Sequence, residues 1–332
     1  MAIATRFAGI VLAVLSIGVA SACNPGRKSP TAPDDVSPEV RAYLSELIAI
    51  LEANSLNRLT INWTSFRASV FDAAGNAQTV ATARPAIETA LQLLGDGHSF
   101  YRAVSGPGAS AATRTCGGAT SSPPALPSTI GYVKISGFSG IGADATAFAN
   151  GIQRAIAAAD RDDTTGWVVD VRGNTGGNMW PMLAGVGPVL GEGIVGYFID
   201  PVGTESAWEY RDGASWDGGE RIQGVDAPYR LRRERPRVAV LIDNGTVSSG
   251  EAVAIAFLRR PDTRSFGAPT CGRSTANQEF KLSDGASLFL TVATMADRTK
   301  FAYGGNILPD EEVLNPAEAE QRAVAWLQGA GR

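Results

Sequence analysis

From residue 129 onward the sequence alternates short apolar runs with helical patterns, and this alternation constrains the fold more than any other feature. The apolar runs at 130–135, 167–171 and 238–242 have the length and composition of buried strands. Helical spacing of apolar residues follows over 143–159, from 179 to about 190 and over 250–260. Strand, turn and helix in succession predict an α/β core with parallel pairing.

The part before this core is predicted to be helical. Ser37 is a suitable N-cap with Pro38 at the first helical position. Further helices are expected over 63–71 and 84–94, which gives a small helical unit ending at the turn Gly95–Ser99. Residues 105–128 are dense in small residues and Pro and are expected to be a linker. Residues 280–293, with a turn at 283–285, indicate a hairpin.

The first residues have the pattern of a targeting segment. Residues 1–22 carry Arg6 as their only charge, then an apolar stretch, then the small residues Ala20, Ser21 and Ala22 of a signal peptidase site. We therefore expect export. Cys23 follows directly, which is typical of a lipoprotein signal with lipidation of that cysteine, and simple secretion is the alternative. In the lipoprotein case the lipid on Cys23 is the only membrane attachment expected, and 24–35 form a flexible tether.

Charge and cysteine content narrow the function classes. The formal net charge is −4, with acidic and basic residues interspersed, which argues against a nucleic-acid partner. Cys116 and Cys271 are an even pair that suits a disulfide in an oxidising compartment, with two unpaired thiols as the alternative. Neither has a neighbouring His or Cys at a metal-ligand spacing, so we expect no zinc site. The chain is expected to divide into a signal peptide (1–22), a flexible tether (23–35), a helical N-terminal unit (36–104), a linker (105–128) and an α/β core (129–332).

The single histidine of the chain, His98, lies in the glycine-flanked turn 94–99. An unperturbed imidazole titrates close to neutral pH, so His98 is the one side chain of this kind available for proton transfer. Lone histidines are also common as structural residues, so its position alone does not assign a role.

Two turns of the predicted core have features of a catalytic site. The turn 170–178 follows a buried strand, and its glycines allow backbone amides to approach a ligand and bind an oxyanion. The turn 246–251 places Ser248 between a buried strand and a helix, where a nucleophile's developing charge is favoured. Each turn also fits a structural role, the first as a tight bend and the second as a helix cap.

Taken together, these motifs give a family resemblance. They follow the order seen in the C-terminal processing (tail-specific) serine peptidases, which the chain resembles from about Gly95 to Val313. The resemblance implies a crotonase-like or ClpP-like spiral α/β core behind the helical N-terminal unit. The segments that carry it are 94–99, 130–133, 170–177, 246–251, 266–272 and 309–310.

The resemblance also implies roles for individual residues. Ser248 corresponds to the family nucleophile, with Ser249 as the neighbouring alternative. Amides of Gly176 or Gly177 and of Ser249 would form the oxyanion hole. The expected activity is hydrolysis of peptide bonds through an acyl-enzyme, with a peptide or protein as substrate. This chemistry needs no metal and no organic cofactor, so we expect neither.

The base departs from the bacterial pattern. Those enzymes use a lysine where this chain has Arg273, and arginine stays protonated and cannot accept the serine proton. The tricorn-like branch of the superfamily uses a histidine, which would be His98 here. Glu251 and Asp297 are both candidates for the acid that orients it. Asp96 suits hydrogen bonding to its own turn better.

Two further expectations concern domain content and function class. Only about 30 residues separate His98 from Gly131, too few for a PDZ domain of typical size. The alternative function, from another class, is a non-catalytic binding module for an apolar ligand or a peptide on the same core. The joint presence of Ser248, His98 and the glycine turn favours catalysis. The sequence does not indicate an oligomeric state.

Overall fold

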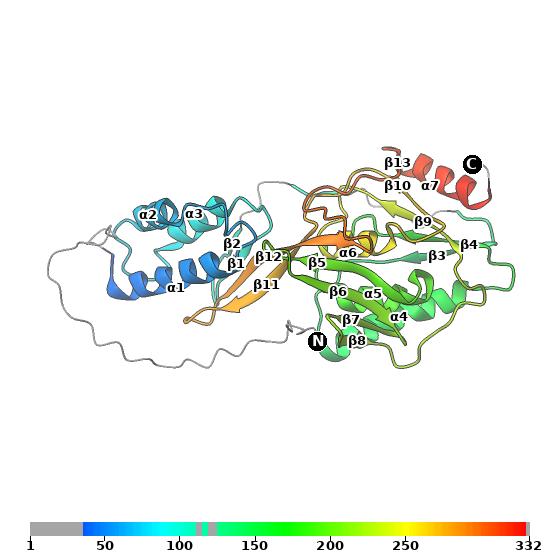
Figure 1. Ribbon diagram of the computed structural model, residues 1–332, viewed down its shortest axis with the longest axis horizontal. Helices are drawn as coiled ribbons and strands as arrows, with labels where there is room; N and C mark the ends of the chain where they lie inside the picture. The colour runs from blue at the N-terminus through cyan, green and yellow to red at the C-terminus, as the bar shows by residue number, and fades with distance from the viewer. Residues whose placement is uncertain (1–35, 111–114, 119–124, 330–332) are drawn as a thin grey trace. The chain divides into compact units, whose positions relative to one another are not determined.

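The computed structural model describes residues 36–110, 115–118 and 125–329, which form two compact units (Figure 1). The N-terminal unit contains the described residues up to 110 together with Gln278–Leu290. The core unit contains the described residues from 115 to Asn277 and from Thr291 onward. The inclusion of 278–290 in the N-terminal unit is a long-range association that local sequence patterns do not reveal.

Three helices build most of the N-terminal unit: α1 (Pro38–Asn54), α2 (Trp63–Ala74) and α3 (Arg84–Leu94). The predicted start of α1 is confirmed, because the Ser37 side chain accepts a hydrogen bond from the Val40 amide at 3.2 Å. Its predicted apolar face is also buried. Five side chains at helical spacing are 0% exposed: Val40, Leu44, Leu47, Ile48 and Leu51.

The predicted hairpin is formed by β11 (Thr275–Lys281) and β12 (Ser287–Asp297). Each of these strands has one part in each unit. Within the N-terminal unit, β12 pairs antiparallel with β1 (Phe100–Arg102), which pairs with β2 (Ala109–Ser110). The Phe100 and Phe289 rings stack with centroids 4.5 Å apart and so reinforce the first of these pairs.

The core unit contains a five-stranded parallel sheet in the order β13-β10-β9-β4-β3, as the strand and helix alternation predicts. The strands are β3 (Ile130–Lys134), β4 (Gly166–Asp170), β9 (Arg237–Ile242), β10 (Thr263–Gly267) and β13 (Glu311–Glu312). The helices of this unit are α4 (Gly142–Ala159), α5 (Met179–Leu190), α6 (Ser249–Phe257) and α7 (Pro316–Leu327).

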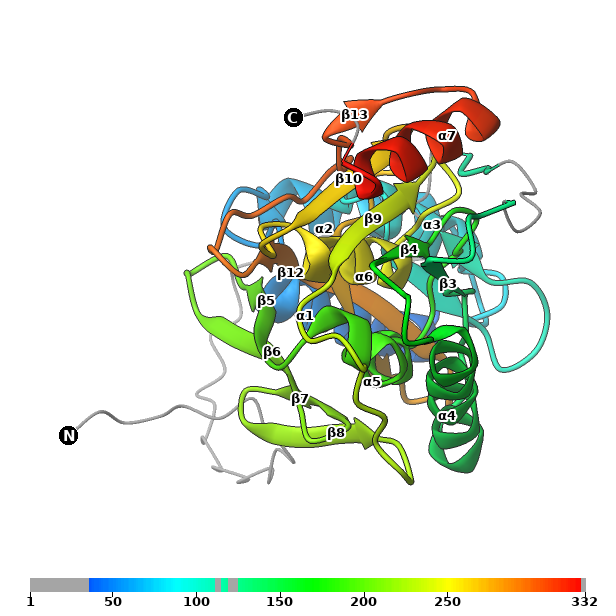
Figure 2. The same cartoon turned by 90° about the vertical axis from the view of Figure 1, so that its right-hand side faces the viewer.

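Helices cover both faces of this sheet, which explains why its central strands are apolar throughout (Figure 2). On β9, Val238 and Val240 belong to the larger core cluster together with residues of α5 and α6. The alternate residues Ala239 and Leu241 pack with Leu327 of α7 on the other face. The parallel sheet is therefore buried on both sides and presents its strand ends as the place for a site.

A second, antiparallel arrangement follows α5. Of its strands, the apolar run near 194–199 predicts only the first. The arrangement consists of β5 (Gly193–Ile199), β6 (Glu205–Arg211), β7 (Ala214–Asp217) and β8 (Glu220–Gly224), while the core part of β12 pairs with β5. Both sheets together make an α/β fold of mixed strand direction. Among the described residues, no helix combines the length and apolar character that crossing a membrane requires.

Candidate active site

The glycine turn and the serine turn lie against each other at the carboxyl ends of β4 and β9. These two strands are parallel neighbours, so the turns that follow them emerge at the same edge of the sheet. The Val247 amide donates to the Asn174 carbonyl at 2.8 Å. A Cβ atom on Gly176 would lie 3.0 Å from Cβ of Ser248. The structure thus brings together Ser248 and the turn proposed to bind an oxyanion.

Ser248 has an unusual backbone conformation, with φ of 53° and ψ of −112°. A non-glycine residue in this region carries strain of about 1–3 kcal/mol and persists only where its surroundings hold it. Helix α6 begins at the next residue, so Ser248 is a sharp corner between β9 and the helix N-terminus. This geometry is typical of a nucleophile elbow, in which the serine side chain is presented at the turn.

Ser249, the alternative nucleophile, uses its hydroxyl differently. Its Oγ donates to the Gly177 carbonyl at 2.6 Å, and the residue is only 5% exposed. This bond fastens the start of α6 to the glycine turn. The geometry therefore favours Ser248 over Ser249 as the reactive serine.

The two glycine amides of the predicted oxyanion hole are not equivalent. The Gly176 amide donates to Asn174 Oδ1 at 2.9 Å and is committed inside its own turn. The amides of Gly177 and Ser249 have no acceptor within the part of the chain that the structure describes. Gly177 is exposed, has a φ of 116°, and a Cβ there would come within 2.1 Å of the Phe138 carbonyl oxygen. Glycine is thus required at 177, and its amide can bind an oxyanion together with that of Ser249.

Glu251 is fully buried and accepts four hydrogen bonds. Oε2 accepts from the amides of Ser248 and Arg273, both at 2.8 Å. Oε1 accepts from the Thr270 hydroxyl at 2.6 Å and from the Gly272 amide at 2.9 Å. Burial raises the pKa of this carboxyl above its usual value, and the four hydrogen bonds oppose that rise. The carboxylate thereby links the strained serine to the segment 270–273.

Asp297, the other candidate acid, is also fully buried, at the end of β12. Oδ1 accepts from the Thr299 amide at 2.8 Å and from its hydroxyl at 2.6 Å, and Oδ2 accepts from the Tyr303 hydroxyl at 2.8 Å. Burial would raise the pKa of Asp297, but the hydrogen bonds from Thr299 and Tyr303 outweigh it and lower the pKa. These contacts give Asp297 a turn-forming role in its own segment.

His98 lies in the N-terminal unit, in the turn that follows α3. Asp96 organises this turn, as expected, since its Oδ1 accepts from the amides of His98 at 2.8 Å and Ser99 at 2.7 Å. Gly95 and Gly97 supply the positive φ angles, 67° and 65°, that the bend needs. His98 is 8% exposed, and its backbone amide is fixed by the bond to Asp96.

Cys116 and Cys271 form a disulfide with a Cα–Cα distance of 5.5 Å. The bond lies in the core unit and joins the segment 115–118 to the segment next to Glu251. The predicted lipidation site Cys23 and the predicted signal segment 1–22 lie outside the described residues. Local sequence patterns indicate no role for Thr270 or Asn174, because Thr270 bonds to Glu251 and the Asn174 carbonyl accepts from the Val247 amide, both across long stretches of chain.

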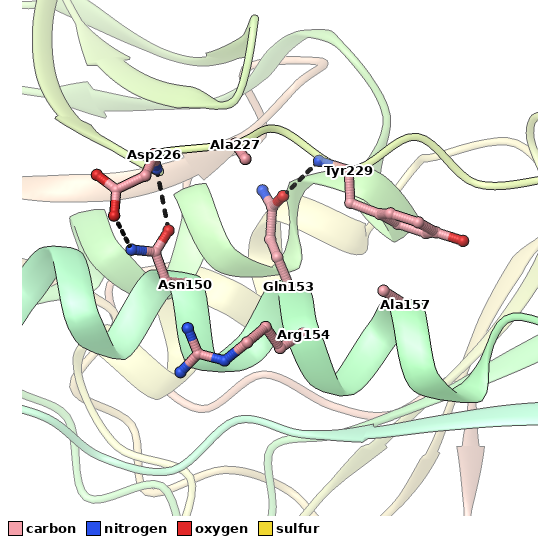
Figure 3. A pocket seen from close by; sticks show the side chains of 7 residues that line it. All are labelled: Asn150, Gln153, Arg154, Ala157, Asp226, Ala227 and Tyr229. Carbon is pink, nitrogen blue, oxygen red and sulfur yellow. Dashed lines mark hydrogen bonds between the residues drawn. The ribbon is translucent and has the colours of Figure 1, made fainter.

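The core unit also has an open cavity of about 260 Å³ along α4 (Figure 3). Its polar side chains mostly satisfy one another. Asn150 bonds both the amide and the carboxylate of Asp226, and Gln153 accepts from the Tyr229 amide. It contains none of the predicted site residues, and its lining consists of Asn150, Gln153, Arg154, Ala157, Asp226, Ala227 and Tyr229. Within the described ranges, no group of three or more His, Cys, Asp or Glu residues is arranged to hold a metal ion.

Comparison with known proteins shows the family to which this chain is similar. Residues 129–313 match the model of peptidase family S41. The nisin-resistance protein of Lactococcus lactis subsp. lactis is 27% identical over 295 residues, which are 88% of each chain. A carboxyl-terminal-processing protease of Synechocystis is 25% identical over 213 residues, which are 61% of this chain and 44% of that protein.

The fold is shared with solved structures. A lipoprotein from Streptococcus agalactiae superposes with a TM-score of 0.67 at 20% identity, covering 89% of this chain and 98% of the other. The photosystem II D1 C-terminal processing protease superposes with a TM-score of 0.56 at 17% identity, covering 84% and 94%. The core is thus the ClpP-like or crotonase-like core of such peptidases, preceded by the helical unit. The family match extends over more than half of the chain, and the chain therefore belongs to peptidase family S41, the serine-type peptidases.

Proposed function

We propose that this peptidase hydrolyses peptide bonds through an acyl-enzyme on Ser248, with His98 as the general base. The observation that carries the proposal is the strained corner at Ser248, which lies against the glycine turn and precedes the N-terminus of α6. A serine hydroxyl is a weak nucleophile until a neighbouring base removes its proton. His98 is the only histidine, and Arg273 cannot serve as that base.

In the proposed reaction, Ser248 Oγ attacks the carbonyl carbon of the substrate while His98 accepts the hydroxyl proton. The amides of Gly177 and Ser249 bind the resulting oxyanion. Collapse of the tetrahedral intermediate breaks the C–N bond, and His98 returns the proton to the leaving amine. A water molecule, deprotonated by His98, then attacks the acyl-enzyme. The ester C–O bond breaks, the acid product leaves, and His98 returns the proton to Ser248 Oγ.

Glu251 enters this scheme as the carboxylate that fixes the backbone of Ser248. All four of its hydrogen-bond donors lie in the core unit, and one is the Ser248 amide itself. A carboxylate has room for about four such bonds. Of the two candidate acids, Glu251 is therefore the one that we place in the site, in a positioning role.

The family implies peptide substrates. One relative is named for resistance to nisin, and a structural relative is described as a lipoprotein. From these two relatives we propose that this chain acts on peptides outside the cytoplasm, as a cell-envelope lipoprotein anchored through Cys23. We also propose that it belongs to a histidine-using, tricorn-like branch of the family, with no PDZ domain between His98 and Gly131.

Labelling with a fluorophosphonate tests the proposal. We expect wild type and Ser249→Ala to be labelled and Ser248→Ala to be unlabelled, because only Ser248 is the nucleophile. In His98→Ala the labelling rate falls by about 10²–10⁴-fold, the usual contribution of a general base. Labelling that persists in Ser248→Ala would exclude the assigned nucleophile, and an unchanged rate in His98→Ala would exclude the assigned base.

A further inference from the structure

The segment from Thr270 to Arg273 surrounds Glu251 with donors. Three of the four bonds to this buried carboxylate come from the segment, and the fourth comes from the Ser248 amide. The Thr270 hydroxyl is the one side-chain donor among them, at 2.6 Å. A buried carboxylate depends on such bonds, since each replaces water that burial has removed.

The disulfide anchors the same segment. Cys271 lies between Thr270 and Gly272, and its amide donates to the Thr246 carbonyl at 3.0 Å. On the other side of the bond, the Gly117 amide donates to Asn244 Oδ1 at 3.3 Å. The chain at 116–118 and the chain at 270–273 are therefore joined covalently, and each also bonds to the turn that leads into Ser248.

These contacts form one continuous path from the disulfide to the reactive serine. The disulfide fixes Cys271, the neighbouring Thr270 and Gly272 hold Oε1 of Glu251, and Oε2 holds the Ser248 amide. Ser248 needs such support because its φ of 53° is strained. None of these groups lies on the expected route of the proton.

We infer that Thr270 is a positioning residue for Ser248, and that the Cys116–Cys271 disulfide keeps the Thr270–Arg273 segment in the position that this role requires. The inference rests on the proposed role of Ser248 as nucleophile. Loss of the Thr270 hydroxyl leaves Oε1 of Glu251 with a single donor, so the carboxylate shifts and the serine corner loosens. The effect falls on the chemical step, because none of these groups is assigned to substrate binding.

The test compares Thr270→Val with Thr270→Ser, using the concentration dependence of fluorophosphonate labelling. Valine keeps the shape but removes the hydroxyl, which donates to Glu251 Oε1 and also accepts from the Ile307 amide at 2.9 Å. We expect the maximal labelling rate to fall by about 10- to 100-fold, as when a hydrogen bond to a charged group is lost. The half-saturating concentration stays within about threefold of wild type. Serine restores the donor, and its maximal rate returns to within about threefold of wild type.

Thr164→Val is the matched control, because Thr164 is 3% exposed and bonds only near the end of α4. We expect the Thr164→Val variant to have a lower melting temperature than wild type and the same maximal labelling rate. In a second measurement the native protein is treated with dithiothreitol. We expect the maximal labelling rate to fall when the disulfide is reduced and to recover on reoxidation, while the circular dichroism spectrum of the fold is retained.

Three outcomes overturn the inference: a wild-type labelling rate in Thr270→Val, a serine variant as slow as the valine variant, or a rate that does not change on reduction. If Thr270→Val fails to fold, the test uses the maximal labelling rates of Thr270→Ser and of the reduced wild-type protein, each compared with untreated wild type. Failure of the proposed function looks different, because there Ser248→Ala is still labelled. If Ser248→Ala is unlabelled and Thr270→Val matches wild type, only the positioning role is wrong.

Discussion

At the scale of single residues, the site depends on backbone conformations that few residues adopt. Ser248 and Gly177 both have positive φ angles. The Ser248 amide is held by Glu251, and the Gly177 carbonyl accepts from the Ser249 hydroxyl. Sequence motifs could indicate both residues, because each lies in a turn between a buried strand and a helix, and the two turns occur in the order that the family resemblance implies. The bonds of Glu251 to Thr270 could not be predicted, since the two residues are 19 positions apart and share no pattern.

The oxyanion assignment gives a prediction at Gly177. In Gly177→Ala the new Cβ would meet the Phe138 carbonyl at 2.1 Å and the φ of 116° becomes strained, so the turn moves and its amide no longer points into the site. We expect kcat to fall by about 10²–10³-fold, as when an oxyanion donor is lost. The measurement is the maximal rate of peptide hydrolysis.

Gly191→Ala is the control for this substitution. Gly191 has a φ of 89°, but a Cβ there would have no neighbour within 4 Å. It should lose stability through backbone strain alone and keep its kcat. Equal kcat values in Gly177→Ala and wild type would contradict the oxyanion role of this amide.

At the scale of elements, apolar periodicity predicted the strands and helices that are buried. It predicted β4 and β9, whose residues are apolar on both faces, and α1, whose apolar face is buried. It missed β6, β7 and β8. In β6 the buried positions alternate but include the polar Ser206, and the first three residues of β8 are exposed. It also missed α7, whose buried side chains are few and mostly small.

Helix α7 is tied to the glycine turn by a buried ion pair. Arg172 bonds Asp170 at 2.8 Å and Glu320 of α7 at 2.7 Å, and Asp170 is fully buried. Burial would raise the pKa of Asp170, but its hydrogen bond with Arg172 and the charges of Arg172 and Lys134 outweigh burial and lower the pKa. The ion pair therefore stabilises the fold at every pH at which the Asp170 carboxyl is ionised.

This pair predicts a pH-dependent effect of Asp170→Asn. At pH 7 the substitution leaves the buried Arg172 without this charge, and we expect a loss of about 3–5 kcal/mol in the free energy of unfolding. Because the pKa of Asp170 is lower in the folded state, its contribution is present above the unfolded pKa of about 3.9 and is lost as the pH falls through the folded value. Urea unfolding of both proteins should therefore show the difference shrinking below about pH 4.

Asp163→Asn is the control, since Asp163 is exposed and pairs with Arg161 at 3.6 Å. The Asp163→Asn variant should differ from wild type in its free energy of unfolding by less than about 1 kcal/mol, both at pH 7 and below about pH 4. A difference between Asp170→Asn and wild type that stays constant down to pH 2 would contradict the assigned cause.

At the scale of the whole molecule, the two units divide the proposed machinery. The core holds Ser248, its oxyanion donors and the disulfide, and the N-terminal unit holds His98. The order of motifs along the sequence was enough to indicate the family. The association of residues 278–290 with the N-terminal unit was not predictable, because it depends on pairing between β12 and β1, nearly 190 positions apart in sequence.

The proposed lipid anchor is also a property of the whole chain. We expect the full-length protein, produced in a bacterial host, to partition into the detergent phase and to begin at a diacylated Cys23, as mass spectrometry of its N-terminal peptide would reveal. Cys23→Ser should partition into the aqueous phase. A wild-type N-terminus that begins elsewhere, or that carries no lipid, would replace lipid anchoring by simple secretion.

The nucleophile is tested most directly by finding the residue that carries the covalent adduct. Wild-type protein is reacted with a fluorophosphonate and digested, and tandem mass spectrometry locates the modified residue. We expect a single adduct on Ser248, formed at least about 100-fold more slowly in His98→Ala. An adduct on Ser249 or elsewhere, or one that forms equally fast without His98, would contradict the assigned roles of Ser248 and His98.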